Sequence, residues 1–238
     1  ILVLFSVIFI SMTKIKEPAL EPFERYSLPK IFSIAPLALA SSFIGGFFVG
    51  GFFTMIPVFI VETFNSIQTV SIFMSVTIIG ALLSQWPIGI LSDKLGRRKM
   101  IAFSSFFITF VSILFLLSVY DENYFYFLGA LLGVGIFCLY PLAVARANDV
   151  ASENKNIMEI SRTLLFAYGL GSFAAPLIIG VGTYFFDNFI FISFLLLSLF
   201  LGFYSLSRER VADENMSVFV NIPSISGAES PSLDPRRE

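Results

Sequence analysis

The chain has 238 residues, of which 56% are hydrophobic and only 13% charged, and its formal net charge is −2. This composition, with a mean hydropathy of +0.86 and 30 phenylalanines, excludes an ordinary water-soluble domain. The sequence has no histidine and one cysteine, Cys138, which excludes a disulfide framework and a Cys/His metal site. We therefore expect a membrane protein in which Cys138 is a small apolar core residue.

The first apolar segment, residues 1–11, is too short to cross a bilayer. As a helix it would reach about 17 Å, whereas the hydrocarbon core is about 30 Å thick. A signal peptide is the alternative, but no basic residues precede this segment and no small-residue cleavage site follows it. We therefore expect residues 1–11 to be the end of a truncated transmembrane helix, and the sequence to be a fragment.

Six later apolar segments are long enough to span a membrane, because about 20 helical residues are sufficient. We predict an all-α, multi-pass bundle over residues 34–206. Its spans are expected at residues 36–61, 70–91, 101–119, 125–145, 164–184 and 189–206. Residues 12–33 would form a loop before the bundle, and the polar residues 207–238 a flexible tail.

Basic residues collect on one side of this predicted topology. Numbering the spans alternately across the membrane places all 15 lysines and arginines on the side of the tail. The opposite side carries only acidic charges, at Glu62, Asp121, Glu122 and Asp187. The positive-inside rule therefore predicts that the basic side, with the carboxyl terminus, is cytoplasmic.

Glycines divide the spans into two kinds. The first, fourth and fifth are rich in glycine, whereas the third has none and the sixth only Gly202. Small residues let membrane helices approach one another closely. We expect the glycine-rich spans and the second span to form the interior, and the third and sixth to face lipid.

The spacing of glycine and proline repeats after three spans. The shared spacings are six residues in Gly51/Pro57 and Gly135/Pro141, and seven residues in Gly80/Pro87 and Gly169/Pro176. Because three is odd, the second triplet would have the opposite topology, which is a 3+3 inverted repeat. Chance is the alternative, since both residues are frequent in membrane helices.

One specific motif lies between the second and third spans, where residues 89–99 read GILSDKLGRRK. It resembles the G-x-x-x-D-[RK]-x-G-[RK]-[RK] signature of the major facilitator superfamily of transporters. The signature positions are Gly89, Asp93, Lys94, Gly96, Arg97 and Arg98. The alternative is an ordinary basic stop after a span.

The resemblance implies a conformational switch in this loop. Gly89 would allow a neighbouring helix to approach, and Asp93 would face the positive N-terminus of another helix. Lys94, Arg97 and Arg98 would pair with carboxylates or lipid headgroups.

The resemblance also implies the place of this chain in a larger fold. The bundle would be helices seven to twelve, residues 1–11 the end of helix six, and residues 12–33 the cytoplasmic loop between the halves. Residues 84–89, 139–143 and 169–172 resemble the bacterial YcaD-like branch of the superfamily, which implies the inner membrane of a bacterium.

The function implied is secondary active transport of a small solute by alternating access, coupled to protons. The expected partners are the solute, the lipid bilayer and a missing amino-terminal half of six helices. We expect no nucleic acid, no cofactor and no enzymatic activity, because the sequence offers no nucleophile with a base. A non-transporting membrane scaffold and a channel are the alternatives.

Few polar residues in the spans are suited to transport chemistry. Gln85, Trp86, Tyr140 and Tyr168 are candidates for solute contact, although Trp and Tyr near a membrane boundary are more often interfacial anchors. Glu62 is the candidate coupling residue, with an ordinary solvated helix end as the alternative. Because this half has almost no buried charge, we expect a neutral or amphipathic solute, with the coupling residue in the missing half.

Overall fold

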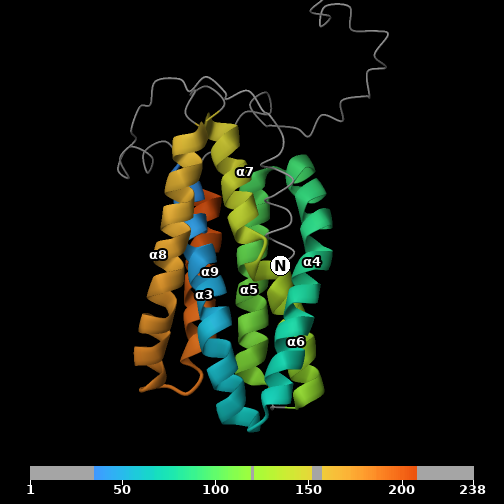
Figure 1. Cartoon of the computed structure of the whole chain (residues 1–238). Coiled ribbons are helices and arrows are strands. Elements are labelled where there is room, and N and C mark those ends of the chain that lie inside the picture. The colour runs from blue at the N-terminus through green and yellow to red at the C-terminus, as the bar shows by residue number, and fades with distance from the viewer. Residues whose placement is uncertain (1–34, 119–120, 152–156, 208–238) are drawn as a thin grey trace, which may run out of the picture.

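The computed structural model describes residues 35–118, 121–151 and 157–207, and these ranges form helices without strands (Figure 1). The helices are α3 (Pro36–Phe64), α4 (Ile67–Leu95), α5 (Arg97–Leu117), α6 (Glu122–Ile136), α7 (Leu139–Ala151), α8 (Ile157–Thr183) and α9 (Phe189–Ser207). The predicted truncated helix at residues 1–11, the loop at 12–33 and the tail beyond residue 207 lie outside the described residues.

Six helical segments are long and apolar enough to cross a membrane, which confirms the predicted number of spans. One of them, Glu122–Val150, consists of α6 and α7 with a turn at Phe137 and Cys138. Pro141 explains the turn, because it has no N–H to donate to the carbonyl of Phe137 one helical turn earlier.

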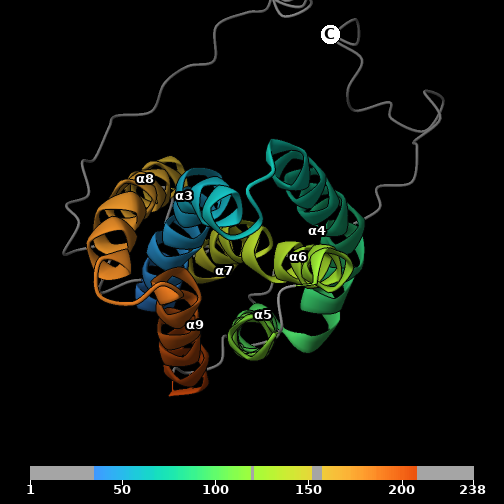
Figure 2. The ribbon, with the colours of Figure 1, turned by 90° about the horizontal axis from the view of Figure 1, so that it is seen from below.

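Three helix pairs dominate the packing: α3 with α8, α4 with α6, and α5 with α9. Viewed along the bundle, α3, α6 and α7 lie in the centre, and α4 and α8 lie on opposite flanks (Figure 2). The α5 and α9 helices lie together on a third side.

Glycines allow two of these pairs to form. A Cβ on Gly46 would collide with the carbonyl of Tyr168, and one on Gly50 with that of Ser172, at the α3–α8 crossing. A Cβ on Gly133 of α6 would collide in the same way with the carbonyl of Thr77 on α4. The prediction of close packing by the glycine-rich spans is therefore confirmed at these crossings.

That α5 and α9 face lipid remains a prediction. They lie together on one side of the bundle (Figure 2), and 56% and 44% of the residues in their most apolar stretches are buried within the described chain, against 28% for each of α4 and α8. Side-chain contacts join them: the hydroxyls of Thr109 and Ser198 are 2.7 Å apart, and Phe106 packs against Gly202. The largest exposed apolar faces of the described chain therefore belong to the flanking helices, α4 and α8.

A phenylalanine cluster fixes the end of the bundle opposite the signature loop. The rings of Phe115 on α5 and Phe191 on α9 stack with centroids 4.3 Å apart, and Phe125 packs edge-on against Phe115 at 5.1 Å. Phe59 and Phe73 join the same cluster from α3 and α4. Because five of the helices contribute a ring, this end is held as one apolar unit.

Candidate functional site

The signature loop is a sharp junction between two helices, at the upper end of the bundle in Figure 1. Gly96 alone separates α4 from α5; its N–H donates to the carbonyl of Ser92 (3.0 Å) and its carbonyl accepts from Met100 (3.2 Å). The φ angle of Gly96 is +90°, in a region that side chains disfavour. Glycine is therefore required here by the backbone itself.

Arg97 connects the loop to two neighbouring helices. It forms an ion pair with Asp93 at the end of α4, and its Nε lies 3.5 Å from Oδ2 of Asp149 on α7. It also donates a hydrogen bond to the hydroxyl of Ser92. The Asp149 side chain is fully buried and that of Arg97 is only 10% exposed, so the network is largely shielded from water.

Arg146 adds a further positive charge to this network. It lies on α7, one turn before Asp149, and interacts electrostatically with both Asp149 and Arg98. Asp149 therefore interacts with two guanidinium groups, those of Arg97 and Arg146.

Arg98 connects the loop to a fourth helix. Its Nη1 donates to the carbonyl of Leu206 in the last turn of α9 (3.3 Å), and the hydroxyl of Ser205 donates to the carbonyl of Arg98 (2.8 Å). A cation at a helix C-terminus interacts favourably with the helix dipole. Consecutive arginines thus attach α5 to α4, α7 and α9.

The other signature residues lie toward the surface of the chain. The side chain of Asp93 is 30% exposed, and Lys94 is exposed. A Cβ on Gly89 would meet nothing within 4 Å among the described residues. The approach of a helix to Gly89 and a contact of Asp93 with another helix therefore remain predictions.

Two of the candidate solute-contacting residues lie together. The rings of Tyr140 on α7 and Tyr168 on α8 have centroids 4.8 Å apart and are tilted by 55°. Both backbones pack against α3, since a Cβ on Gly45 would lie 3.5 Å from the Tyr140 nitrogen and one on Gly46 would collide with Tyr168. The glycine face of α3 therefore determines where the backbones of the two tyrosines lie.

The remaining candidates are not part of this pair. Gln85 and Trp86 project from the exposed flank helix α4, and Trp86 is 78% exposed. Glu62 is exposed near the end of α3, on the side opposite the signature loop. The roles of Gln85, Trp86 and Glu62 in transport therefore remain predictions.

Asp149 was missed in the sequence. The predicted fourth span ended at residue 145, which left Asp149 in a loop, whereas α7 continues as a helix to Ala151. The available signal was a carboxylate one helical turn after Arg146, on a side of the membrane otherwise dominated by basic residues.

The described part of the chain contains no cluster of three or more histidine, cysteine, aspartate or glutamate side chains that could hold a metal ion. Cys138 is buried beside Ser84, with sulfur and hydroxyl oxygen 3.7 Å apart, in agreement with the expected core position.

Comparisons with known proteins agree on the family. Residues 38–218 match the model of the Major Facilitator Superfamily. The chain is 27% identical over 177 residues to YcaD, an uncharacterized MFS-type transporter of Escherichia coli strain UMN026, covering 74% of this chain and 45% of the relative. It is 27% identical over 142 residues to YcaD of Salmonella arizonae, covering 60% and 36%. The chain thus spans less than half of these relatives, and no solved structure matches it significantly.

Proposed function

Because this chain belongs to the Major Facilitator Superfamily, we propose that it is the carboxy-terminal half of a secondary transporter that moves a small solute by alternating access. Members of this superfamily are membrane transporters and not enzymes. The observation that carries the proposal is the family match over six apolar helices that correspond to less than half of the relatives. Alternating access then needs a second half against which this one moves.

An inverted repeat would account for the helix packing. Gly46 and Gly50 of α3 contact Tyr168 and Ser172 of α8, and Gly129 and Gly133 of α6 contact Phe73 and Thr77 of α4. On each of the four helices, the two contacting positions are four residues apart. If α3 corresponds to α6–α7 and α4 to α8, both crossings join the same two members of the repeat, and the α5–α9 pair joins the third member to its own counterpart. This agreement supports the 3+3 arrangement.

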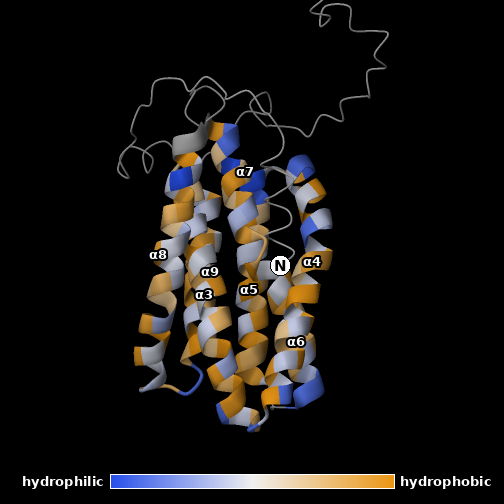
Figure 3. Cartoon of the chain, in the orientation of Figure 1, coloured by the Kyte–Doolittle hydropathy of each residue, from blue (hydrophilic) through white to orange (hydrophobic). Residues whose placement is uncertain are grey.

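The proposed orientation places the signature loop in the cytoplasm of a bacterial inner membrane. Hydrophilic residues gather at both ends of the bundle and the middle is mainly apolar, as a spanning protein requires (Figure 3). The end with the signature loop carries Lys94 and Lys99, whereas Asp121, Glu122 and Asp187 lie at the other end. This asymmetry supports the assignment by the positive-inside rule.

The Arg97 network supports the proposed switch. Arg97 and Asp149 anchor the loop to α7, while Asp93 is partly exposed and shares the same guanidinium. Asp93 can therefore turn toward a helix N-terminus in the other half while Arg97 keeps Asp149 as a partner. Such a contact contributes about 0.3–1 kcal/mol, or up to about 2 when partly buried, which shifts a two-state equilibrium roughly two- to thirtyfold.

The tyrosine pair supports a neutral or amphipathic solute. Tyr140 and Tyr168 are half-buried, and together offer aromatic faces and hydroxyls without a charge. The carboxylates and guanidiniums of the described residues lie near the two ends of the helix bundle. Proton coupling, which we include in the proposal, would then rely on an ionisable group in the other half.

The proposal is tested by comparing the full-length transporter with residues 1–238 alone, each reconstituted in liposomes. We expect both to insert, and only the full-length protein to show saturable uptake of a neutral amphipathic solute that increases with a proton gradient. Saturable transport by residues 1–238 without dimerisation would contradict the proposal. Single-channel currents from the full-length protein would indicate a channel, and absence of any flux a scaffold.

A further inference from the structure

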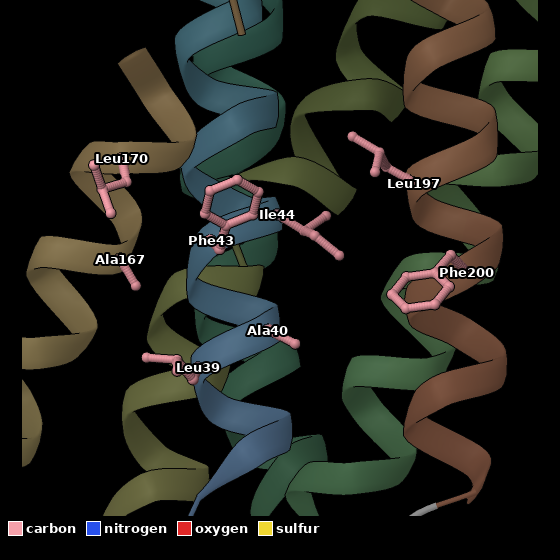
Figure 4. A pocket seen from close by; sticks show the side chains of 8 residues that line it. All are labelled: Leu39, Ala40, Phe43, Ile44, Ala167, Leu170, Leu197 and Phe200. Carbon is pink, nitrogen blue, oxygen red and sulfur yellow. The ribbon is translucent and has the colours of Figure 1, made fainter. Parts of the chain in front are cut away.

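An apolar groove lies between α8 and α9, with α3 as its floor (Figure 4). The walls are formed by Ala167 and Leu170 of α8 and by Leu197 and Phe200 of α9, and the floor by four residues of α3, Leu39, Ala40, Phe43 and Ile44. Its volume is about 360 Å³. Both walls pack on α3 more than on each other, which leaves the space between them open.

The position of the groove determines what surrounds it. All three helices that form it are long and apolar enough to span a membrane, and every lining side chain is apolar. A polar solute would find no hydrogen-bonding partner among these residues. A lipid acyl chain is apolar, flexible and already present at this depth, so it can fill the groove and restore the dispersion contacts that an empty space would lose.

An arginine lies beyond each wall of the groove, at the same end of the bundle. On α8, Arg162 is exposed and lies five residues before Ala167, or about 7.5 Å along the helix axis. On α9, Tyr204 stacks on Phe200 with ring centroids 5.8 Å apart, and Arg98 binds the carbonyl of Leu206 just beyond. Guanidinium groups bind phosphate oxygens through paired hydrogen bonds.

We propose that this groove holds one acyl chain of an anionic phospholipid of the phosphatidylglycerol class, whose phosphate contacts Arg162 and Arg98. The acyl chain in the groove holds the lipid in place, and the two arginines favour a headgroup with net negative charge. This lipid site requires that α3, α8 and α9 span the membrane, and is independent of the solute and of the transport cycle.

The test is native mass spectrometry of the full-length transporter. The delipidated protein is incubated with equal amounts of phosphatidylglycerol and phosphatidylethanolamine that carry identical acyl chains. We expect phosphatidylglycerol to be retained preferentially, by about fivefold for each arginine, since one basic residue near a membrane surface contributes about 1 kcal/mol. Arg162→Gln should lower this preference about fivefold, and Arg162→Lys should keep most of it.

Two further variants test the groove itself. Ala167→Phe fills the space and should lower retention of both lipids, and Leu170→Trp should do the same if Ala167→Phe does not fold. Leu165→Phe, at a position of α8 that is 59% exposed and outside the groove, is the matched control and should retain lipid normally. Equal retention of the two lipids by the native protein would overturn the proposal. Undiminished retention in the groove-filling variants, or equal loss in Leu165→Phe, would overturn it as well.

Discussion

The Nε atom of Arg97 lies 3.5 Å from Oδ2 of the buried Asp149, so the signature loop is attached to a helix that its own motif does not include. Asp93 pairs with the same guanidinium through its Nη1 atom. One arginine therefore has a buried partner on α7 and a partly exposed partner on α4. We expect the two carboxylates to have different roles, one in stability and the other in the switch.

We expect Asp149→Asn to destabilise the protein. The substitution removes a buried charge partner of Arg97, and breaking a buried pair typically costs about 3–5 kcal/mol. The measurement is the thermal unfolding midpoint of the purified full-length protein. Asp187→Asn, at an exposed position, should leave the midpoint unchanged. The pairing is not supported if Arg97→Gln and Asp149→Asn lower stability additively, because partners in one network should be coupled.

Asp93→Asn should instead leave insertion and abundance near normal. Asp93 is partly exposed, so its loss should mainly shift the full-length protein toward the cytoplasm-open state, by roughly two- to thirtyfold, and slow turnover. Cross-linking across the cytoplasmic face of the native protein and the variant measures this population. If cross-linking and transport both stay at native levels, the loop is only a basic stop signal.

The glycines of α3 and α8 offer a matched pair of substitutions. Gly46→Ala should prevent normal packing, because the new Cβ would collide with the backbone of Tyr168. Gly169→Ala should be neutral or slightly stabilising, since a Cβ there meets nothing within 4 Å and alanine favours a helix by about 0.8–1.0 kcal/mol over glycine. Unfolding midpoints and gel filtration of the full-length variants distinguish the two. Equal stability of both variants would contradict the α3–α8 crossing.

Gly89→Leu tests whether another half approaches α4. Nothing in the described chain contacts this position, so residues 1–238 should insert and pack normally with the substitution. In the full-length transporter the leucine should separate the helices and slow transport severalfold. Transport rates and the protease resistance of residues 1–238 are the measurements. Native transport by the full-length variant would argue against a close helix contact at Gly89.

The topology is tested with single cysteines in a full-length protein whose Cys138 is replaced by alanine. Cysteines at the exposed positions Asn65 and Asn123 should react with an impermeant thiol reagent added to intact cells. Cysteines at Lys94 and Lys99, which are exposed at the other end, should react only after the membrane is opened. Labelling of this second pair in intact cells would invert the proposed orientation.

The sequence by itself determined the class of this protein, its six spans and the residues of its signature loop. Hydropathy over about 20 residues is sufficient to locate a span, since the backbone must satisfy its own hydrogen bonds in lipid. The glycine pattern also predicted close helix crossings, of which those at Gly46, Gly50 and Gly133 are confirmed. These properties depend on residues that are near one another in the chain.

Only the tertiary structure decided which distant residues meet. Asp149 is 52 positions from Arg97 and became a partner because α7 continues past the expected end of its span. The burial of α5 and α9 depends on contacts between them, such as Thr109 with Ser198, which no local pattern contains. The groove beside Phe200 exists because three helices leave a space between them. Local hydropathy is fixed by neighbours in the sequence, whereas pairing and cavities depend on how the helices cross.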